Sequence, residues 1–271
     1  MSRMQHNLEA LSFRIVMTLL AILALILIVS PSLVVVIVSF TSGFSLKFPP
    51  PGYSTRWYVE LWNAWQLQFA ARNSVVVALW STGLSILLGV AASLAISRSK
   101  TLTAKLLDSL FMSPLVLPAL AFGLAALMFF SLIGLPVSLL TLVIGHTIVC
   151  VPYVVRNTVA ALAQLEPTLL ESSAILGASR LYTFRRIVLP LIRPGIISGA
   201  FIAFMSSFDN VPVSLFLADE RTEVLPIHLW QQIDTNLDVR TAAISGVIII
   251  VTILLMVLAE RFAGLSRQLA R

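Results

Sequence analysis

Apolar and polar residues alternate along this chain in long blocks. Each apolar block is about as long as a helix needs to cross the hydrocarbon core of a bilayer, roughly 20 residues, and polar connectors separate the blocks. We therefore predict an all-α polytopic membrane protein with six transmembrane helices, in a single domain over residues 1–271. The predicted spans cover residues 15–40, 73–96, 106–130, 136–155, 194–217 and 241–259.

Small residues recur at every fourth position in two of these spans. They are Ser81, Ser85, Gly89 and Ser93 in the second span, and Gly195, Gly199, Ala203 and Ser207 in the fifth. Lipid supplies no hydrophobic drive for helices to associate, so a face of small residues lets a neighbouring helix approach closely. In the third span, Pro114 and Pro118 each remove a helical hydrogen bond and predict a kink.

Composition and charge indicate the surroundings and the orientation. The chain is 58% hydrophobic and only 11% charged, which suits lipid rather than water. Its net charge of +6 comes from loop residues beside apolar runs, so it indicates membrane topology and no nucleic-acid partner. Of the 18 Lys and Arg, those in connectors on one side are Lys47, Arg56, Arg72, Arg221 and Arg240. The others lie on the opposite side, which the positive-inside rule assigns to the cytoplasm, together with both termini and residues 164–190.

Two connectors are therefore expected outside. Residues 41–71 are rich in Pro and aromatic residues and form either an interfacial aromatic belt or a short amphipathic segment. Residues 218–240 form an acidic loop, in which Val224 to Ile233 has the pattern of a short surface helix.

The motifs of common enzymes are missing from the sequence. Lys47, Lys100 and Lys105 each lack a preceding glycine, so the chain has no phosphate-binding GxxxxGK[ST] loop. There is no HExxH motif and no Cys–His cluster, so we predict no catalytic and no metal-binding residue. His146 lies in the fourth span, where a histidine is more often a hydrogen-bonding packing residue than a ligand.

Asp209 is the one acidic residue predicted well inside a span. An ionised side chain there costs about 2.5–3.5 kcal/mol, so it should face protein or a water-filled path. It is either a buried carboxylate hydrogen-bonded to a neighbouring helix or a cation-facing group on a translocation path. The candidate path residues are Phe208, Asp209, Asn210 and Ser214.

Residues 164–190 form a charged segment between spans. Pro167 after Glu166 is typical of a helix N-terminus, and Gly177 ends that helix. Ser179 is placed to cap a second short helix, Leu181 to Leu189, and Pro190 to return the chain to apolar sequence. Such an ordered segment between membrane spans indicates a docking site.

This segment resembles the cytoplasmic "EAA" signature of ATP-binding-cassette (ABC) importer permeases. The family pattern is E-A-A, three residues, G, nine residues and I-x-L-P. The matching residues are Glu171, Ser172, Ser173, Ala174, Gly177, Ile187, Leu189 and Pro190, with serines in place of the two alanines. Further stretches, Asn73-Ser74, SPLVLPALAFGLA, SFDNVPVSLFLA and LPIHLW, look like the second permease of spermidine/putrescine-type importers.

The resemblance implies a type-I ABC importer permease fold with a cytoplasmic coupling helix, in the bacterial inner membrane. It also implies an ABC ATPase dimer that carries ATP and Mg, a second homologous permease in a heterodimer rather than a homodimer, and a periplasmic binding protein. By the same resemblance, this chain itself would bind no cofactor and would not be an enzyme. The implied ATPase-coupling residues are Leu170, Glu171, Ser172, Ser173, Ala174, Gly177, Ala178, Ser179, Arg185 and Pro190. Arg185 and Arg186 would pair either with acids on the ATPase or with anionic membrane lipid.

The implied cargo is a small solute, a polyamine or a related cationic, amino-containing compound. Polyamine carriers often have a second acid where this chain has Asn210, and related permeases serve opines, iron and other solutes. Two alternative functions stay open. One is a secondary transporter that couples ions through Asp209, and the other is a membrane-embedded structural subunit without a path of its own.

Overall fold

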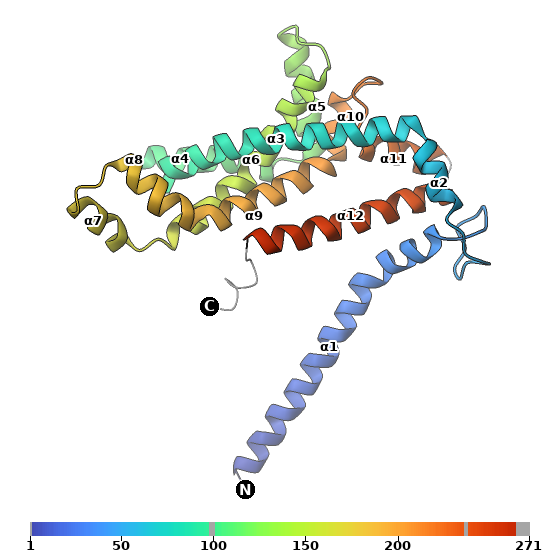
Figure 1. The fold of residues 1–271 in the computed structure, drawn as a ribbon, viewed down its shortest axis with the longest axis horizontal. Coiled ribbons are helices and arrows are strands. Elements are labelled where there is room, and N and C mark those ends of the chain that lie inside the picture. The colour runs from blue at the N-terminus through green and yellow to red at the C-terminus, as the bar shows by residue number, and fades with distance from the viewer. Residues whose placement is uncertain (1, 98–100, 236–237, 264–271) are drawn as a thin grey trace. The chain divides into compact units, whose positions relative to one another are not determined.

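The computed structural model describes residues 2–97, 101–235 and 238–263, and helices make up most of this part of the chain (Figure 1). The helices are α1 (Ser2–Ser39), α2 (Arg56–Asn63), α3 (Trp65–Ser97), α4 (Leu102–Val116), α5 (Ala119–Leu132), α6 (Leu139–Ala163), α7 (Pro167–Ile175), α8 (Arg180–Thr183), the π-helix η1 (Phe184–Val188), α9 (Leu189–Phe208), α10 (Val211–Leu217), α11 (Leu225–Thr235) and α12 (Val239–Ala263). Arg98, Lys100, Arg267 and Arg271, which belong to the predicted cytoplasmic charge, lie outside the described residues.

The described helices include five that are long and apolar enough to cross a membrane, and a sixth if α4 and α5 form one broken span. The five are Phe13–Ser39, Trp65–Ser97, Leu139–Ala163, Arg180–Phe208 and Val239–Arg261. The prediction of an all-α polytopic membrane protein is thereby confirmed.

The third predicted span, residues 106–130, is broken rather than kinked. α4 ends at Val116, α5 begins at Ala119, and the two helix axes differ by 106°. The cause is Pro118, which has no N–H and which disfavours the helical conformation of the residue before it. Leu117 accordingly has an extended backbone, with φ −72° and ψ 141°. Pro114 lies inside α4 and does not break it.

The chain divides into two compact units, which are described separately. The first contains Met1–Asn63 and Gln232–Ile253. Within it, the side chain of Trp57 is buried against Val239 and Ala243, and its Nε1 donates a hydrogen bond to the carbonyl of Thr41 at 2.9 Å. The connector therefore contains a short helix, α2, whose Trp57 packs inside this unit, while Trp62 of the same helix is 81% exposed.

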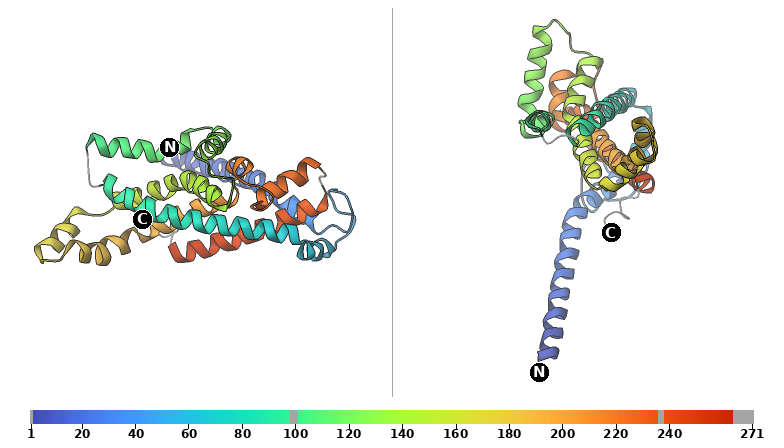
Figure 2. Two further views of the ribbon diagram at one scale, coloured as in Figure 1. Left: turned by 90° about the horizontal axis from the view of Figure 1, so that it is seen from above. Right: turned by 90° about the vertical axis from the view of Figure 1, so that its left-hand side faces the viewer.

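The second unit contains Ala64–Gln231 and Leu254–Arg271, and its centre is a bundle of α3, α6 and α9 (Figures 1 and 2). The small-residue face of α3 packs against α6. Ser81, Ser85 and Ser93 donate hydrogen bonds to the carbonyls of Val143, Thr147 and Val155 at 3.2, 3.4 and 3.2 Å. At Gly89, an added Cβ would lie 2.9 Å from the side chain of Val154, so only glycine permits this approach.

The small-residue face of α9 packs against the same helix. At Gly199, an added Cβ would lie 2.9 Å from the Cα of Val154, which is backbone that no rotamer change can move. Further along, the carbonyl of Ala203 accepts a hydrogen bond from the thiol of Cys150 at 3.2 Å. Both four-residue repeats predicted from the sequence therefore mark helix contacts, and α6 is their shared partner.

The fifth predicted span, residues 194–217, differs from the structure at both ends. The helix does not restart at the prolines, because a continuous helical run extends from Arg180 to Phe208. The π-helical turn η1 shifts the backbone hydrogen-bond pattern just before Pro190, so the missing N–H of that proline does not end the helix. At the other end, Asp209 and Asn210 interrupt the helix before α10 begins.

Candidate functional site

The predicted coupling segment consists of α7, a left-handed glycine turn, and α8 continuing into η1. Pro167 is the first residue of α7, where its missing N–H costs no hydrogen bond. Gly177 has φ +75°, a conformation that residues with a Cβ rarely adopt. Ser179 caps α8 by accepting a hydrogen bond from the N–H of Tyr182 at 3.3 Å. A hydrogen bond of 2.7 Å between the hydroxyls of Ser173 and Thr183 joins α7 to α8.

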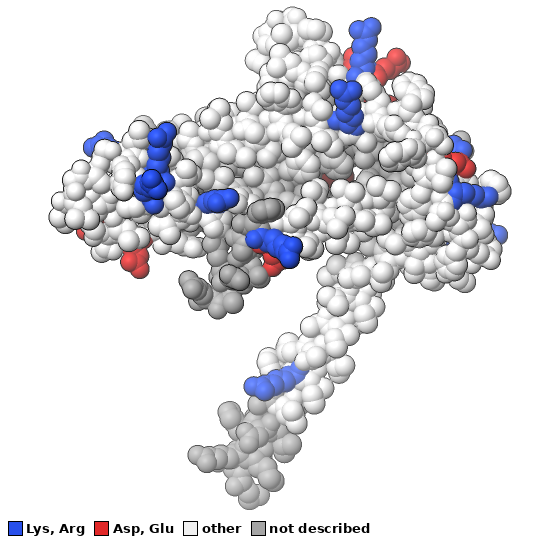
Figure 3. Space-filling model, viewed as in Figure 1, with Lys and Arg blue, Asp and Glu red and all other residues white. Residues whose placement is uncertain are grey.

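This segment lies at one end of the bundle, and its surface includes large exposed apolar side chains as well as charged ones. Ile175 and Leu176 are each 85% exposed, and Leu181 is 61% exposed. Figure 1 places α7 and α8 at the end of the α3–α6–α9 bundle, and Figure 3 shows Lys and Arg side chains around that end. Contiguous exposed apolar residues of this kind are typical of a protein–protein contact.

A cavity of about 620 Å³ lies beside the turn. Among the predicted coupling residues, those that line it are Ser172, Ser173, Gly177, Ala178 and Ser179. The others, which do not line it but are exposed, are Leu170, Glu171, Ala174, Arg185 and Pro190. Ser173 is buried and bonded to Thr183, so its side chain holds the two helices together rather than facing outward.

The candidate path residues lie at the break between α9 and α10. Phe208 ends α9, with its ring stacked on Phe204 at 6.0 Å between centroids. The side chain of Asp209 is exposed in this chain and lies outside any helix, so no other helix of this chain buries it as the sequence-based alternative supposed. Asn210 is buried, and its Oδ1 caps α10 by accepting from the N–H of Val213 at 2.9 Å. Ser214 lies one helical turn further on and is 1% exposed.

His146 connects the two sides of this break to α6. Its Nδ1 lies 2.8 Å from the hydroxyl of Ser207 on α9, and its Nε2 lies 3.0 Å from the hydroxyl of Ser214 on α10. The prediction that His146 is a packing residue is confirmed. Its partners were not predicted, since nothing in the spacing of a lone histidine indicates which serines of other helices it meets.

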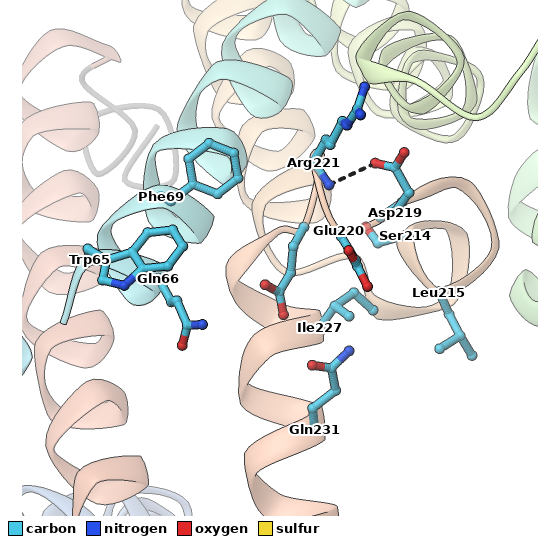
Figure 4. Close-up of a pocket in the computed structure, with 12 residues that line it drawn as sticks. Trp65, Gln66, Phe69, Ser214, Leu215, Asp219, Glu220, Arg221, Ile227 and Gln231 are labelled. Carbon is cyan, nitrogen blue, oxygen red and sulfur yellow. Dashed lines mark hydrogen bonds between the residues drawn. The ribbon is translucent and has the colours of Figure 1, made fainter.

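A second cavity, of about 750 Å³, lies among the start of α3, the end of α10, the loop after it and α11 (Figure 4). Its lining residues are Trp65, Gln66, Phe69, Ser214, Leu215, Ala218, Asp219, Glu220, Arg221, Glu223, Ile227 and Gln231. Of the candidate path residues, only Ser214 is among them. The sequence shows both the aromatic connector and the acidic loop, but about 150 residues separate them and nothing in the pattern brings them together.

Hydrogen bonds hold the acidic loop in place. Asp219 Oδ1 accepts from the hydroxyl of Thr222 at 2.6 Å, and from the N–H groups of Thr222 and Arg221 at 2.9 and 3.1 Å. These bonds, the Thr222 hydroxyl first among them, lower the pKa of Asp219 below its usual value. Glu223 Oε1 lies 3.3 Å from Nδ1 of His228.

The loop is also attached to α3. Asn73 Nδ2 donates to the carbonyl of Glu223 at 2.9 Å, and Ser74 Oγ accepts from the N–H of Leu225 at 2.8 Å. The Asn73-Ser74 pair thus ties the first turns of α3 to the beginning of α11. Among the described residues, no group of three or more His, Cys, Asp and Glu is arranged to hold a metal ion.

Comparisons with known proteins agree with this architecture. Residues 85–269 match the protein family described as binding-protein-dependent transport system inner membrane component. The spermidine/putrescine transport system permease protein PotC of Haemophilus influenzae is 28% identical over 233 residues, covering 85% of this chain and 89% of that protein. The molybdenum transport system permease protein ModB of Mycobacterium bovis is 31% identical over 204 residues, covering 70% of this chain and 77% of that protein.

The fold also matches a solved structure. A chain from the crystal structure of a bacterial ABC transporter involved in the import of the acidic polysaccharide alginate superposes with a TM-score of 0.70. The match covers 99% of this chain and 100% of that one at 17% sequence identity, which shows the fold alone. The resemblance inferred from the sequence is confirmed: this chain belongs to the family of binding-protein-dependent transport system inner membrane components and is a permease subunit of an ABC importer.

Proposed function

We propose that this permease is driven by a separate ABC ATPase dimer that docks on α7, the Gly177 turn and α8. The observation that carries the proposal is the exposure of Ile175 and Leu176, 85% each, on a segment that also bears the EAA-like residues. Burying two such side chains at a contact stabilises it by about 1.5–3 kcal/mol each. ATP and Mg belong to the partner, and this chain binds no cofactor. The segment and both termini face the cytoplasm of a bacterium.

The continuous helical run after the turn supplies the mechanical link. It extends over the 29 residues Arg180–Phe208, and at about 1.5 Å per residue it is roughly 40 Å long. A displacement at α8 when the ATPase dimer closes is therefore carried along α9 to the break at Asp209. There the helical run ends, and the hydrogen bonds of His146 to Ser207 and Ser214 couple the displacement of α9 to α6 and α10. The break is the place where the path opens or closes.

The complete importer contains a second homologous permease, a different chain rather than a copy of this one, and a periplasmic binding protein that delivers the solute. The substrate is a small cation such as a polyamine. Two facts support this class: the relative PotC is a spermidine/putrescine permease, and Asp209 is exposed at the break. ModB is a molybdenum permease, so transport of an oxyanion is the outcome that would contradict it.

Reconstitution with the cognate ATPase tests the docking. Glu171→Lys reverses an exposed charge in the motif, and Gly177→Arg puts a bulky side chain at φ +75°. Both variants are expected to lose ATPase binding and transport. Glu166→Lys makes the same charge change at the N-cap of α7, outside the motif, and should retain both. Binding of the ATPase to the Glu171→Lys variant with unchanged affinity would contradict the assignment of this segment as the docking site.

Uptake by the reconstituted protein in lipid vesicles distinguishes an ABC importer from the alternative of a secondary transporter. An ABC importer stops when ATP is depleted and continues when an uncoupler removes the ion gradient. Uptake that survives ATP depletion and collapses with the uncoupler would instead assign ion coupling to Asp209.

A further inference from the structure

We infer that the cavity among α3, α10 and α11 is a binding site for an organic ammonium ion. The transported solute occupies this site before it reaches the break at Asp209. The inference rests on the proposed import function and adds a location and a recognition chemistry to it. Four kinds of observation carry it: the aromatic wall, the charge of the facing loop, the amide of Gln66 beside them, and the way the loop and α10 are held.

The first wall is aromatic. Trp65 and Phe69, one helical turn apart on α3, both line the cavity, and they are 71% and 37% exposed. Figure 4 shows both rings on the α3 side, across the cavity from Glu220 and Ile227. An ammonium group within about 6 Å of such a ring is attracted by the negative face of its π-system, and Trp is the strongest of these partners.

The second wall is acidic. Its charged residues are Asp219, Glu220, Glu223 and Arg221, so three carboxylates meet one guanidinium. Figure 4 shows the Arg221 side chain extending away from Gln231, while its backbone N–H donates to Asp219 at 3.1 Å. The lining therefore carries a net negative charge where it faces the rings. An oxyanion entering this space would be repelled, whereas a cation would be attracted.

The amide of Gln66 supplies a neutral hydrogen-bond acceptor beside the carboxylates. Carboxylates and amide oxygens accept the N–H bonds of an ammonium group, and the aromatic faces accommodate the methylene chain between such groups. The described acids are not grouped to hold a bare metal ion. This combination favours an organic cation with an apolar chain.

The cavity is preformed on its loop side. Asn73 and Ser74 bind the loop to α3, and the Thr222–Asp219 bonds close the turn. The α10 wall is held by the bond of 3.0 Å from Ser214 to His146, and α10 starts directly after the break at Asp209. An occupant that contacts α3 and α10 together therefore favours one position of α10 over others. Occupancy of the cavity is thereby linked to the opening and closing proposed for the break at Asp209.

Equilibrium binding to the complete importer in lipid nanodiscs, without binding protein, tests the site, with putrescine and spermidine as probes. Glu220→Gln with Glu223→Gln should raise the Kd about tenfold, because the charge pairs of one exposed and one partly buried carboxylate are lost at up to about 1 kcal/mol each. Trp65→Leu should raise the Kd about 2- to 5-fold, as expected for an exposed cation–π contact.

Matched controls lie outside the cavity lining. Asp234→Asn removes an exposed acid on α11, and Trp230→Leu removes an indole that is 56% exposed on the same helix. Both should leave the Kd unchanged. Because Glu223 also contacts His228, the single variant Glu220→Gln is measured too, and its Kd should rise about threefold.

Two results would overturn the inference. One is an unchanged Kd in Glu220→Gln and in Trp65→Leu. The other is preferential binding of molybdate over either amine. Neither result touches the ATPase assignment, which fails only in the docking experiment with Glu171→Lys. Conversely, Gly177→Arg should abolish transport and leave amine binding intact, so the two proposals can fail separately.

Discussion

Replacing His146 by leucine should loosen the connection of α9 and α10 to α6. The imidazole makes two hydrogen bonds, of 2.8 Å to Ser207 and 3.0 Å to Ser214, and it is 1% exposed. Measured side-chain hydrogen bonds between membrane helices average about 0.6 kcal/mol and reach about 1.7 kcal/mol. The two bonds together therefore contribute about 1–3 kcal/mol to the free energy of unfolding. Leucine fills much of the same space and leaves both hydroxyls without this partner.

A double-mutant cycle isolates these bonds from the change in packing. The free energy of unfolding of the importer in mixed micelles is measured for His146→Leu, Ser207→Ala and Ser214→Ala, and for each pair with His146→Leu. The serine substitutions should cost less in the leucine background, with a coupling energy of about 0.5–1.5 kcal/mol per pair. Ser198→Ala is the control, because its hydroxyl donates to Pro194 within its own helix, at 2.8 Å. Equal costs in both backgrounds would refute the stabilising role of the two His146 hydrogen bonds.

Further predictions concern helix packing and the outer loop. Gly199→Leu should strongly reduce the folded fraction in micelles, because its Cβ would lie 2.9 Å from the Cα of Val154, whereas Gly83→Leu meets nothing within 4 Å and should be tolerated. Equal losses would contradict the close contact of α6 with α9. Because the pKa of Asp219 is lowered from 3.8, its stabilisation of the turn is fully present above pH 3.8 and is lost as pH falls through the lowered pKa. Thr222→Val should move that loss to higher pH, measured as proteolysis of the loop between pH 2 and 5 with an acid-active protease, and an unmoved profile would argue against the hydroxyl's role.

The turns around the coupling segment could be predicted because their causes are local. Pro167 suits a first helical turn, and Gly177 supplies the φ of +75° that ends α7, whatever the rest of the chain does. The continuation of the second helix through Pro190 could not be predicted, since it depends on the π-helical turn η1 before that proline. Likewise Pro118 predicts a disturbance, but the angle of 106° between α4 and α5 depends on what each helix packs against.

By itself, the sequence determined the membrane environment, the approximate positions of the apolar helices and the faces through which two of them pack. These properties follow from hydropathy and from a four-residue period, and both are read along one segment at a time. The family signature is a local pattern of the same kind.

Only the tertiary structure decided which segments meet. It brought the faces of α3 and α9 to the same helix α6, joined His146 to serines on both sides of the Asp209 break, and placed Trp65 opposite the acidic loop. Such contacts join residues far apart in the chain. They depend on the paths of the helices between them, and no period within a single segment records those paths.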